Sequence, residues 1–226
     1  MAGKFIVIDG TDGSGKGTQF ELLKERMVKE GLDLETVDFP RYDEPSSYFV
    51  TRYLNGAYGS KEDVAAKEAS LFYALDRYEA KAGIKEALSV GKTVLANRFT
   101  SSNMGLQGAK IKDASERIKL FEWLDELEHE ILKIPRPDCV IVLDVPGAVA
   151  QANVDKKQER TYTKKKRDIH EADATYLHTA NETYKQLCEL YPKQFVKIDC
   201  MRNDTQMRSE SEIHNLIWQV YQQKTA

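Results

Sequence analysis

Short runs of consecutive apolar residues alternate along this chain with longer segments in which apolar residues recur every three or four positions. Residues 5–8 (FIVI) are all apolar and rich in β-branched residues, as in a strand buried on both faces. Further strands are predicted at residues 34–39, 93–96, 139–143 and 195–198. Helical spacing falls at residues 16–30, 61–90, 112–133, 169–191 and 208–223. Strands separated by helices pair in parallel through right-handed crossovers. We therefore expect an α/β fold, a three-layer sandwich with a five-stranded parallel sheet between helices.

The composition changes this picture little and excludes some partners. The 226 residues carry 33 Lys and Arg against 36 Asp and Glu, a net charge of −3, and 41% are hydrophobic. No repeat or low-complexity linker divides residues 1–226, which predicts a single domain. A slightly acidic chain is a poor general binder of nucleic acid, and no apolar stretch approaches the ~20 residues of a membrane-spanning helix. Three scattered cysteines and no secretory signal pattern indicate a cytoplasmic location.

The most specific motif is a glycine-rich loop between the first strand and the first helix. Residues 10–18 read GTDGSGKGT and fit G-x-x-x-x-G-K. Glycines let consecutive backbone N–H groups turn toward phosphate oxygens, and the helix that follows points its positive end at the same anion. Lys16 adds a mobile positive charge for the β- and γ-phosphates. The predicted ATP-binding residues are Gly10, Thr11, Asp12, Gly13, Ser14, Gly15, Lys16, Gly17 and Thr18.

The metal side of this loop departs from the usual pattern. Gly17 stands where a Ser or Thr normally contacts Mg²⁺. We expect the metal to be held mainly by phosphates and water, with Thr18 or Asp9 as candidates for a contact through water. Guanine-specific GTPases carry an Asn-Lys-x-Asp element, and the chain has no Asn-Lys dipeptide, which argues against a GTPase.

A concentrated run of positive charge lies at residues 156–167. It reads KKQERTYTKKKR, seven basic residues and one acidic, so it carries +6 and the remainder of the chain −9. A charge run is usually a solvated face, but this one lies where nucleotide kinases carry a mobile lid. Cations on a lid that closes over the transferring phosphoryl group favour transfer. We therefore predict a lid insertion at residues 155–168, with Arg160 and Arg167 as transition-state contacts and Lys164, Lys165 and Lys166 as further cations.

Four further segments follow the loop in a recognisable order. They read FPRY at 39–42, LFYALDRYE at 71–79, NRFTSSN at 97–103 with LQGAK at 106–110, and PRPD at 135–138. Together with the loop they resemble the thymidylate kinase family over nearly the whole chain. The resemblance implies transfer of the ATP γ-phosphoryl group to dTMP with Mg²⁺, giving ADP and dTDP for dTTP synthesis, by a homodimer.

The resemblance also assigns roles to single residues. Arg98 and Arg41 would hold the acceptor monophosphate, a task that suits planar guanidinium forks, and Asp12 would accept a hydrogen bond from the deoxyribose 3′-OH. Tyr73 would stack on thymine, and Arg77, one helical turn later, would donate to a base carbonyl. The predicted substrate-binding residues are Asp12, Phe39, Arg41, Tyr73, Arg77, Arg98, Ser102, Asn103 and Gln107. The predicted catalytic residues are Lys16, Asn97, Arg98, Arg160 and Arg167.

Two positions depart from the family pattern and keep alternatives open. Leu106 replaces a tyrosine common in the base pocket, so a kinase of another nucleoside monophosphate such as dUMP, or of a deoxynucleoside, remains an alternative. Asn97 replaces the usual Asp and lacks its charge. The consequence is a slower enzyme, compensation by another acid such as Asp9, or a catalytically weak nucleotide-binding relative. A nucleic-acid-binding ATPase that uses the basic lid is disfavoured by the −9 remainder.

Overall fold

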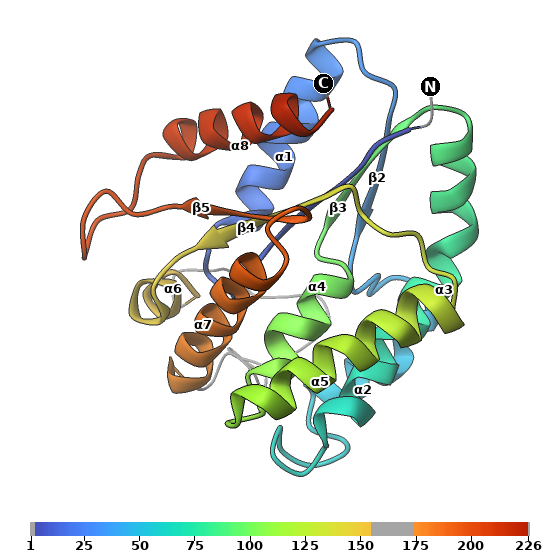
Figure 1. The fold of residues 1–226 in the computed structure, drawn as a ribbon, viewed down its shortest axis with the longest axis vertical. Coiled ribbons are helices and arrows are strands. Elements are labelled where there is room, and N and C mark those ends of the chain that lie inside the picture. Colours follow the sequence, from blue (N-terminus) through green and yellow to red (C-terminus); the bar gives the residue numbers. More distant parts are fainter. Residues whose placement is uncertain (1–2, 155–173, 226) are drawn as a thin grey trace.

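A five-stranded parallel sheet forms the centre of the molecule (Figure 1). The structure is a computed structural model that describes residues 3–154 and 174–225. The strands are β1 (Phe5–Gly10), β2 (Leu34–Asp38), β3 (Thr93–Asn97), β4 (Cys139–Asp144) and β5 (Phe195–Asp199), in the order β2-β3-β1-β4-β5. All four neighbouring pairs are parallel. The expected α/β class and the five strands are confirmed.

The helices connect these strands. They are α1 (Lys16–Lys29), α2 (Tyr48–Leu54), α3 (Ala66–Ser89), α4 (Thr100–Ser102), α5 (Ala114–Asp125), α6 (Gly147–Val154), α7 (Ala174–Leu190) and α8 (Glu210–Thr225). A 3₁₀ turn, η1 (Pro45–Ser47), precedes α2, and two π-helical turns, η2 (Asn103–Gln107) and η3 (Glu126–Ile131), extend α4 and α5. The described part of the chain contains no helix long and apolar enough to cross a membrane.

Alternation along each strand divides the core into two layers. Phe5 and Val7 of β1 face a cluster that includes side chains of α3, α5 and α7. Ile6 and Ile8 face a second cluster with side chains of α1 and α8. Because neighbouring residues of a strand point to opposite faces, the four apolar residues 5–8 of β1 are buried on both faces of the sheet. The expected three-layer sandwich follows (Figure 1).

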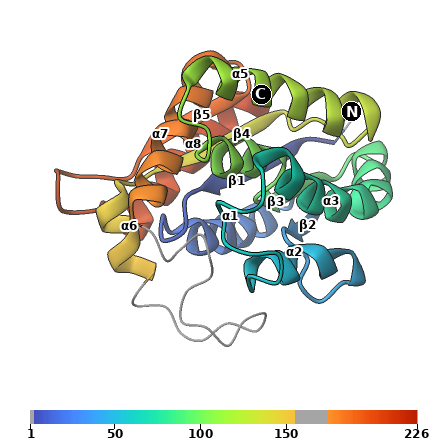
Figure 2. The same ribbon diagram turned by 90° about the horizontal axis from the view of Figure 1, so that it is seen from below.

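The helices deviate from the sequence prediction in two places. The short helices α2 and α6 were missed, because seven or eight residues are too few for a clear helical period. α2 lies beside α3 (Figure 2) and packs Val50 and Tyr53 against it in a small separate cluster. The predicted lid, residues 155–168 with Arg160, Lys164, Lys165, Lys166 and Arg167, lies outside the described residues.

Parallel strands bring their carboxyl ends to one edge of the sheet. Gly10, Asp38 and Asn97 end β1, β2 and β3, and the backbone register pairs Asp38 with Asn97. Open α/β sheets bind their ligands at this edge, where neighbouring connections diverge. Connections from β1 and β3 therefore form the site.

Candidate active site

The phosphate loop has the backbone that its glycines predict. Gly10, Gly13 and Gly15 have φ angles of 144°, 81° and 86°, in a range that L side chains rarely adopt. A Cβ on Gly13 would also lie 2.0 Å from the backbone oxygen of Ala150. Among the described residues, the buried hydroxyls of Thr11 and Ser14 have no hydrogen-bond partner. The loop thus offers polar atoms for a phosphate to satisfy.

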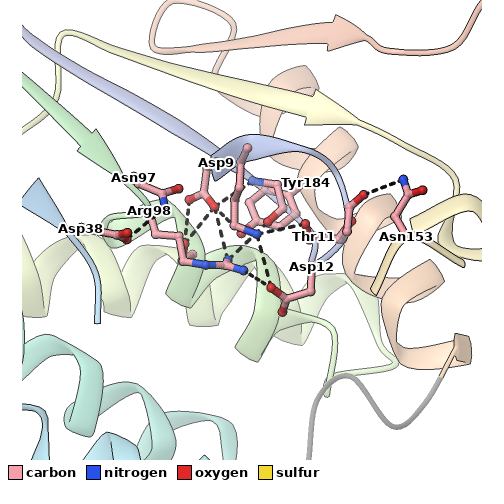
Figure 3. Close-up of polar contacts among 12 residues, drawn as sticks. Asp9, Thr11, Asp12, Asp38, Asn97, Arg98, Asn153 and Tyr184 are labelled. Carbon is pink, nitrogen blue, oxygen red and sulfur yellow. Dashed lines mark hydrogen bonds and ion pairs between the residues drawn. The ribbon is translucent and has the colours of Figure 1, made fainter. Parts of the chain in front are cut away.

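Two cations converge on one carboxylate of this loop (Figure 3). The Nζ atom of Lys16 donates to the backbone oxygen of Thr11 at 3.1 Å and to Oδ1 of Asp12 at 3.3 Å. The Nη2 atom of Arg98 donates to the same Asp12 oxygen at 2.7 Å. Lys16 from the donor loop and Arg98 from the end of β3 are therefore neighbours, as the site prediction requires.

Arg98 is held in an uncommon conformation. Its φ is 63°, in the left-handed region, which costs a non-glycine residue roughly 1–2 kcal/mol. Nη1 donates to the backbone oxygen of Gly10 at 3.3 Å and lies 3.8 Å from Oδ1 of Asp9. Burial works against the guanidinium charge, but Asp12, with help from Asp9, keeps the pKa of Arg98 above its ordinary value. Arg98 therefore stays charged.

Asp9 differs from its predicted role. Its carboxylate is fully buried and accepts hydrogen bonds from the hydroxyls of Ser101, Ser102 and Tyr184 and from the backbone N–H of Gly10. These donors occupy both oxygens. The structure therefore makes Asp9 a support for the loop and for Arg98 (Figure 3), and does not favour it as a metal contact or as the acid that compensates for Asn97.

The carboxylate beside Asn97 is Asp38. Nδ2 of Asn97 donates to Oδ1 of Asp38 at 3.0 Å (Figure 3), while the buried Oδ1 of Asn97 has no hydrogen-bond partner in the described chain. Partial burial raises the pKa of the Asp38 carboxyl, and the bond from Asn97 and the charge of Arg98 oppose that rise. The positive charge of Lys16 also lowers the pKa of Asp38. The carboxylate is therefore close enough to the phosphate loop to feel its charge.

These groups suit a magnesium ion that is bound with its nucleotide. No cluster of three or more His, Cys, Asp or Glu side chains exists within the described ranges, so they contain no all-protein cage. Mg²⁺ usually keeps several waters and takes one or two carboxylates together with substrate phosphates. The carboxylate of Asp38 and the unpartnered oxygen of Asn97 supply such ligands at the rim of the loop. Thr18 lies exposed in the first turn of α1.

A pocket opens beside the loop and collects the predicted substrate residues. Its empty volume is about 530 Å³. Eight of the nine predicted substrate-binding residues line it: Asp12, Phe39, Tyr73, Arg77, Arg98, Ser102, Asn103 and Gln107. The remaining lining residues are Pro40, Tyr42, Leu54 and Leu106. The buried Oε1 atom of Gln107 has no partner in the described part of the protein, which leaves it as an acceptor for a ligand.

Arg41 is the predicted residue that the pocket does not include. Its Nε donates to Oδ1 of Asp76 at 3.1 Å, and its Nη2 donates to the hydroxyl of Ser46 at 2.8 Å. Asp76 is 1% exposed, so a hydrogen-bonded ion pair in low dielectric fixes the guanidinium away from the pocket. The expectation that Arg41 holds the acceptor phosphate is not supported. Its neighbour Tyr42 lines the pocket instead.

Arg77 lines the pocket. It is held there by a residue that the sequence did not predict, Glu128. Glu128 on η3 accepts from Nε and Nη2 of Arg77 at 2.6 and 2.7 Å. The same carboxylate accepts from Nδ2 of Asn103 at 2.9 Å. Glu128 lies in an acidic stretch of a helical segment, where an acid is normally solvated, so the sequence gives no signal of its burial.

A second missed residue supports the loop from α6. Nδ2 of Asn153 donates to the backbone oxygen of Gly13 at 3.0 Å (Figure 3). Asn153 lies two residues before the predicted lid segment at 155–168. A single Asn in a short unrecognised helix carries no sequence signal for this contact.

The fold and site together define a class of protein. A phosphate loop before α1, Lys16 and Arg98 beside it, and an adjoining pocket are the parts of a P-loop nucleotide kinase, with a donor site on the loop and an acceptor site in the pocket. The thymidylate kinase family model matches residues 8–210, and the chain belongs to that family. Its members transfer a phosphoryl group from ATP to dTMP and use Mg²⁺.

Individual relatives agree over nearly the full length. The chain is 28% identical over 226 residues to the thymidylate kinase of Afipia carboxidovorans, covering 99% of this chain and 91% of the relative. It is 27% identical to the thymidylate kinase of Plasmodium falciparum, covering 96% of each. A solved thymidylate kinase structure from Candida albicans superposes with a TM-score of 0.72 at 17% identity, over 99% of this chain and 93% of that one. This last likeness supports the fold.

Proposed function

We propose that this chain transfers the γ-phosphoryl group of ATP to the phosphate of dTMP, giving ADP and dTDP. One observation carries the proposal: Lys16 of the donor loop and Arg98 of the acceptor pocket meet at the Asp12 carboxylate. Asp12 therefore belongs both to the phosphate loop and to the lining of the pocket. An acceptor phosphate on Arg98 lies next to a donor phosphate on Lys16, as direct transfer requires.

Each residue at this junction has a distinct task. The loop amides and Lys16 bind the donor phosphates, and Lys16 neutralises charge that builds up on the transferring group. Arg98 binds the acceptor phosphate, held by Asp9, Gly10 and Asp12 before the substrate arrives. A group that is already oriented needs little reorganisation when the substrate binds. We further propose that Asp12 accepts from the sugar 3′-OH and that residues 155–168 form the lid, with Arg160 and Arg167 facing the phosphates.

We propose that Asp38 compensates for the carboxylate that is missing at position 97. Asp38 places a negative charge one strand away, hydrogen-bonded to Asn97 and within the influence of Lys16 and Arg98. We propose that the pair acts as one unit: Asp38 supplies the charge and Asn97 an uncharged oxygen. Bound Mg²⁺ would screen the phosphate charges there. This supports an active enzyme over a catalytically weak relative.

The proposed transfer depends on Lys16, and the Lys16→Ala variant tests it. Removing the ammonium should lower kcat/KM for ATP and dTMP by about a hundredfold or more, as for other preorganised cations. The matched control is Lys24→Ala, because Lys24 lies on the same helix with an exposed side chain paired to Glu21; its turnover should equal that of the wild type. Unchanged turnover in Lys16→Ala, with circular dichroism showing a folded protein, contradicts the assignment.

We also propose that the protein is a homodimer through α3. Leu71, Leu75 and Tyr78 are 42%, 47% and 44% exposed and are spaced four and three residues apart, so they share one helix face. Phe49 of α2 is also exposed and stacks on Phe72 of α3, with ring centroids 5.9 Å apart. A contiguous exposed apolar patch is typical of a protein interface. A second copy of the chain supplies the same patch through a two-fold axis.

We finally propose a cytoplasmic location without a nucleic-acid partner. Cys139, Cys188 and Cys200 are free thiols, which suits a reducing compartment. The phosphate loop and the pocket suit the binding of mononucleotides rather than of a nucleic-acid backbone.

A further inference from the structure

One buried carboxylate connects the two polar side chains at the base end of the pocket. Arg77, Glu128 and Asn103 are 1%, 0% and 2% exposed. Oε1 of Glu128 accepts from Nη2 of Arg77 at 2.7 Å and from Nδ2 of Asn103 at 2.9 Å. Both donors share one oxygen atom, so Arg77 and Asn103 lie side by side although they come from α3 and η2. Glu128 itself reaches them from η3.

The hydrogen bonds fix which way the amide of Asn103 faces. Its Nδ2 donates to Glu128 and also to the backbone oxygen of Ser70 at 3.1 Å. Both partners are acceptors, so only the NH₂ group of the amide fits there. Asn103 lines the pocket, and the polar atom left for a ligand is its carbonyl oxygen. Glu128 thereby makes Asn103 an acceptor.

The same contacts fix what Arg77 offers. Glu128 holds Nε and Nη2 in a two-pronged pair, which leaves Nη1 as the nitrogen that is not part of it. Arg77 therefore offers a donor next to the acceptor of Asn103. Glu128 also neutralises the charge of the Arg77 guanidinium. This end of the pocket therefore distinguishes ligands by their hydrogen-bond donors and acceptors rather than by their charge.

We propose that Glu128 is a positioning residue that sets base choice in the acceptor pocket. A donor beside an acceptor matches a pyrimidine that carries a ring carbonyl beside a ring N–H, as thymine and uracil do. Cytosine presents the reverse pattern, an amino group beside an unprotonated ring nitrogen, and leaves buried groups on both sides unpaired. Sites built on such groups reject the mismatched ligand strongly. The inference rests on the proposed transfer to a pyrimidine monophosphate and names the residue that orients its recognition.

The Glu128→Gln variant tests this role, because Gln keeps the shape of the side chain and replaces one acceptor oxygen by a donor. Whichever way the Gln amide turns, its NH₂ group meets a donor of Arg77 or Asn103 that the carboxylate had accepted, so the fixed arrangement of the two side chains is lost. We expect KM for dTMP to rise about tenfold and the preference for dTMP over dCMP in kcat/KM to fall about tenfold or more. The preference for dTMP over dUMP and kcat at saturating dTMP should stay near the wild-type values.

Glu130→Gln is the matched control. Glu130 lies two residues further along the same turn, with an exposed side chain that pairs with Arg136. The same substitution there should leave KM and both preferences unchanged. An unchanged dTMP-to-dCMP ratio in Glu128→Gln overturns the inference, whether or not KM rises, since Glu128 then supports the pocket without setting base choice. Absence of transfer to dTMP by the wild type instead contradicts the proposed function.

A second variant covers the case in which Glu128→Gln does not fold. Arg77→Met with Glu128→Met removes both charges of the pair, and such apolar replacements are often tolerated. The double variant leaves the amide of Asn103 without its carboxylate partner. Calorimetry gives the Kd values for dTMP and dCMP. Their ratio should be at least about tenfold smaller in the double variant than in the wild type. A preserved difference in affinity overturns the inference.

Discussion

At the scale of single residues, the site is built on carboxylates that fix cations and amides. Asp12 joins Lys16 to Arg98, Asp9 supports Arg98 from β1, and Glu128 holds Arg77. A buried carboxylate with several donors has a rigid position, because breaking any one contact leaves a desolvated polar atom. The functional cations are therefore placed before any substrate binds.

The charge of Asp38 gives the first prediction at this scale. Asp38→Asn removes the carboxylate beside Asn97 and should lower kcat about tenfold or more, since an electrostatic contact near the transferring group is lost. Exchanging the two groups, Asp38→Asn with Asn97→Asp, returns one negative charge to the pair and should recover most of the activity. Steady-state kinetics with ATP and dTMP measures both.

The control for this pair is Asp43→Asn, an exposed carboxylate in the loop after β2, which should have no effect on kcat. If Asp38→Asn is as active as the wild type, the charge of Asp38 has no part in the reaction. If the exchanged pair is no better than Asp38→Asn alone, the two positions do not act as a unit.

At the scale of elements, the phosphate loop depends on its fit to α6. Gly13 is in the left-handed region and its Cα faces the backbone of Ala150, while Asn153 bonds to its carbonyl oxygen. The loop is thus held between β1 and α6. Its conformation reflects both its glycines and the helix packed against it.

Gly13→Ala tests this packing. The added Cβ would overlap the Ala150 oxygen at a positive φ, so we expect a loss of about 2 kcal/mol or more in the free energy of unfolding and weaker ATP binding. Chemical denaturation and an ATP titration measure the two effects. Gly83→Ala serves as the control: its Cβ meets nothing within 4 Å in the middle of α3, and it should gain about 0.5–1 kcal/mol. Normal ATP binding by Gly13→Ala contradicts the fit.

The elements also show how far the sequence alone can be followed. The strands were predictable because residues such as Phe5–Ile8 are apolar on both faces, and the phosphate loop because its glycines and Lys16 have a fixed spacing. The pocket residues were predicted from the resemblance of several short segments to the thymidylate kinase family. Glu128, 51 residues from Arg77, could not be predicted, since burial of one acid among several depends on long-range packing.

Arg41 shows that the sequence can also suggest a binding residue that a tertiary contact makes unavailable. Its position after β2 suggested a phosphate ligand, but Asp76 on α3 takes up its guanidinium. The partner is 35 residues away and is itself buried among helix residues. Local sequence identifies which residues can bind an anion, and tertiary contacts decide which of them remain available.

At the scale of the whole molecule, the apolar face on α3 is the feature that a monomer does not explain. The proposed dimer through Leu71, Leu75 and Tyr78 predicts a mass twice the 25.8 kDa of the chain. Leu75→Glu places two like charges across the two-fold axis and should produce monomers in light scattering after gel filtration. Val28→Glu alters an apolar residue of α1 that is 60% exposed and should leave the dimer intact. A wild-type monomer contradicts the proposal.

The central claim is that the phosphate loop and the adjoining pocket carry out one transfer between ATP and a thymidine monophosphate. A coupled assay of ADP release tests it most directly, using the purified chain with ATP, Mg²⁺ and one acceptor at a time: dTMP, dUMP, dCMP, a purine monophosphate, thymidine or none. We predict rapid ADP release with dTMP, little with dCMP or the purine nucleotide, and none without an acceptor. ADP release that does not depend on the acceptor, or is absent with dTMP, would contradict the account.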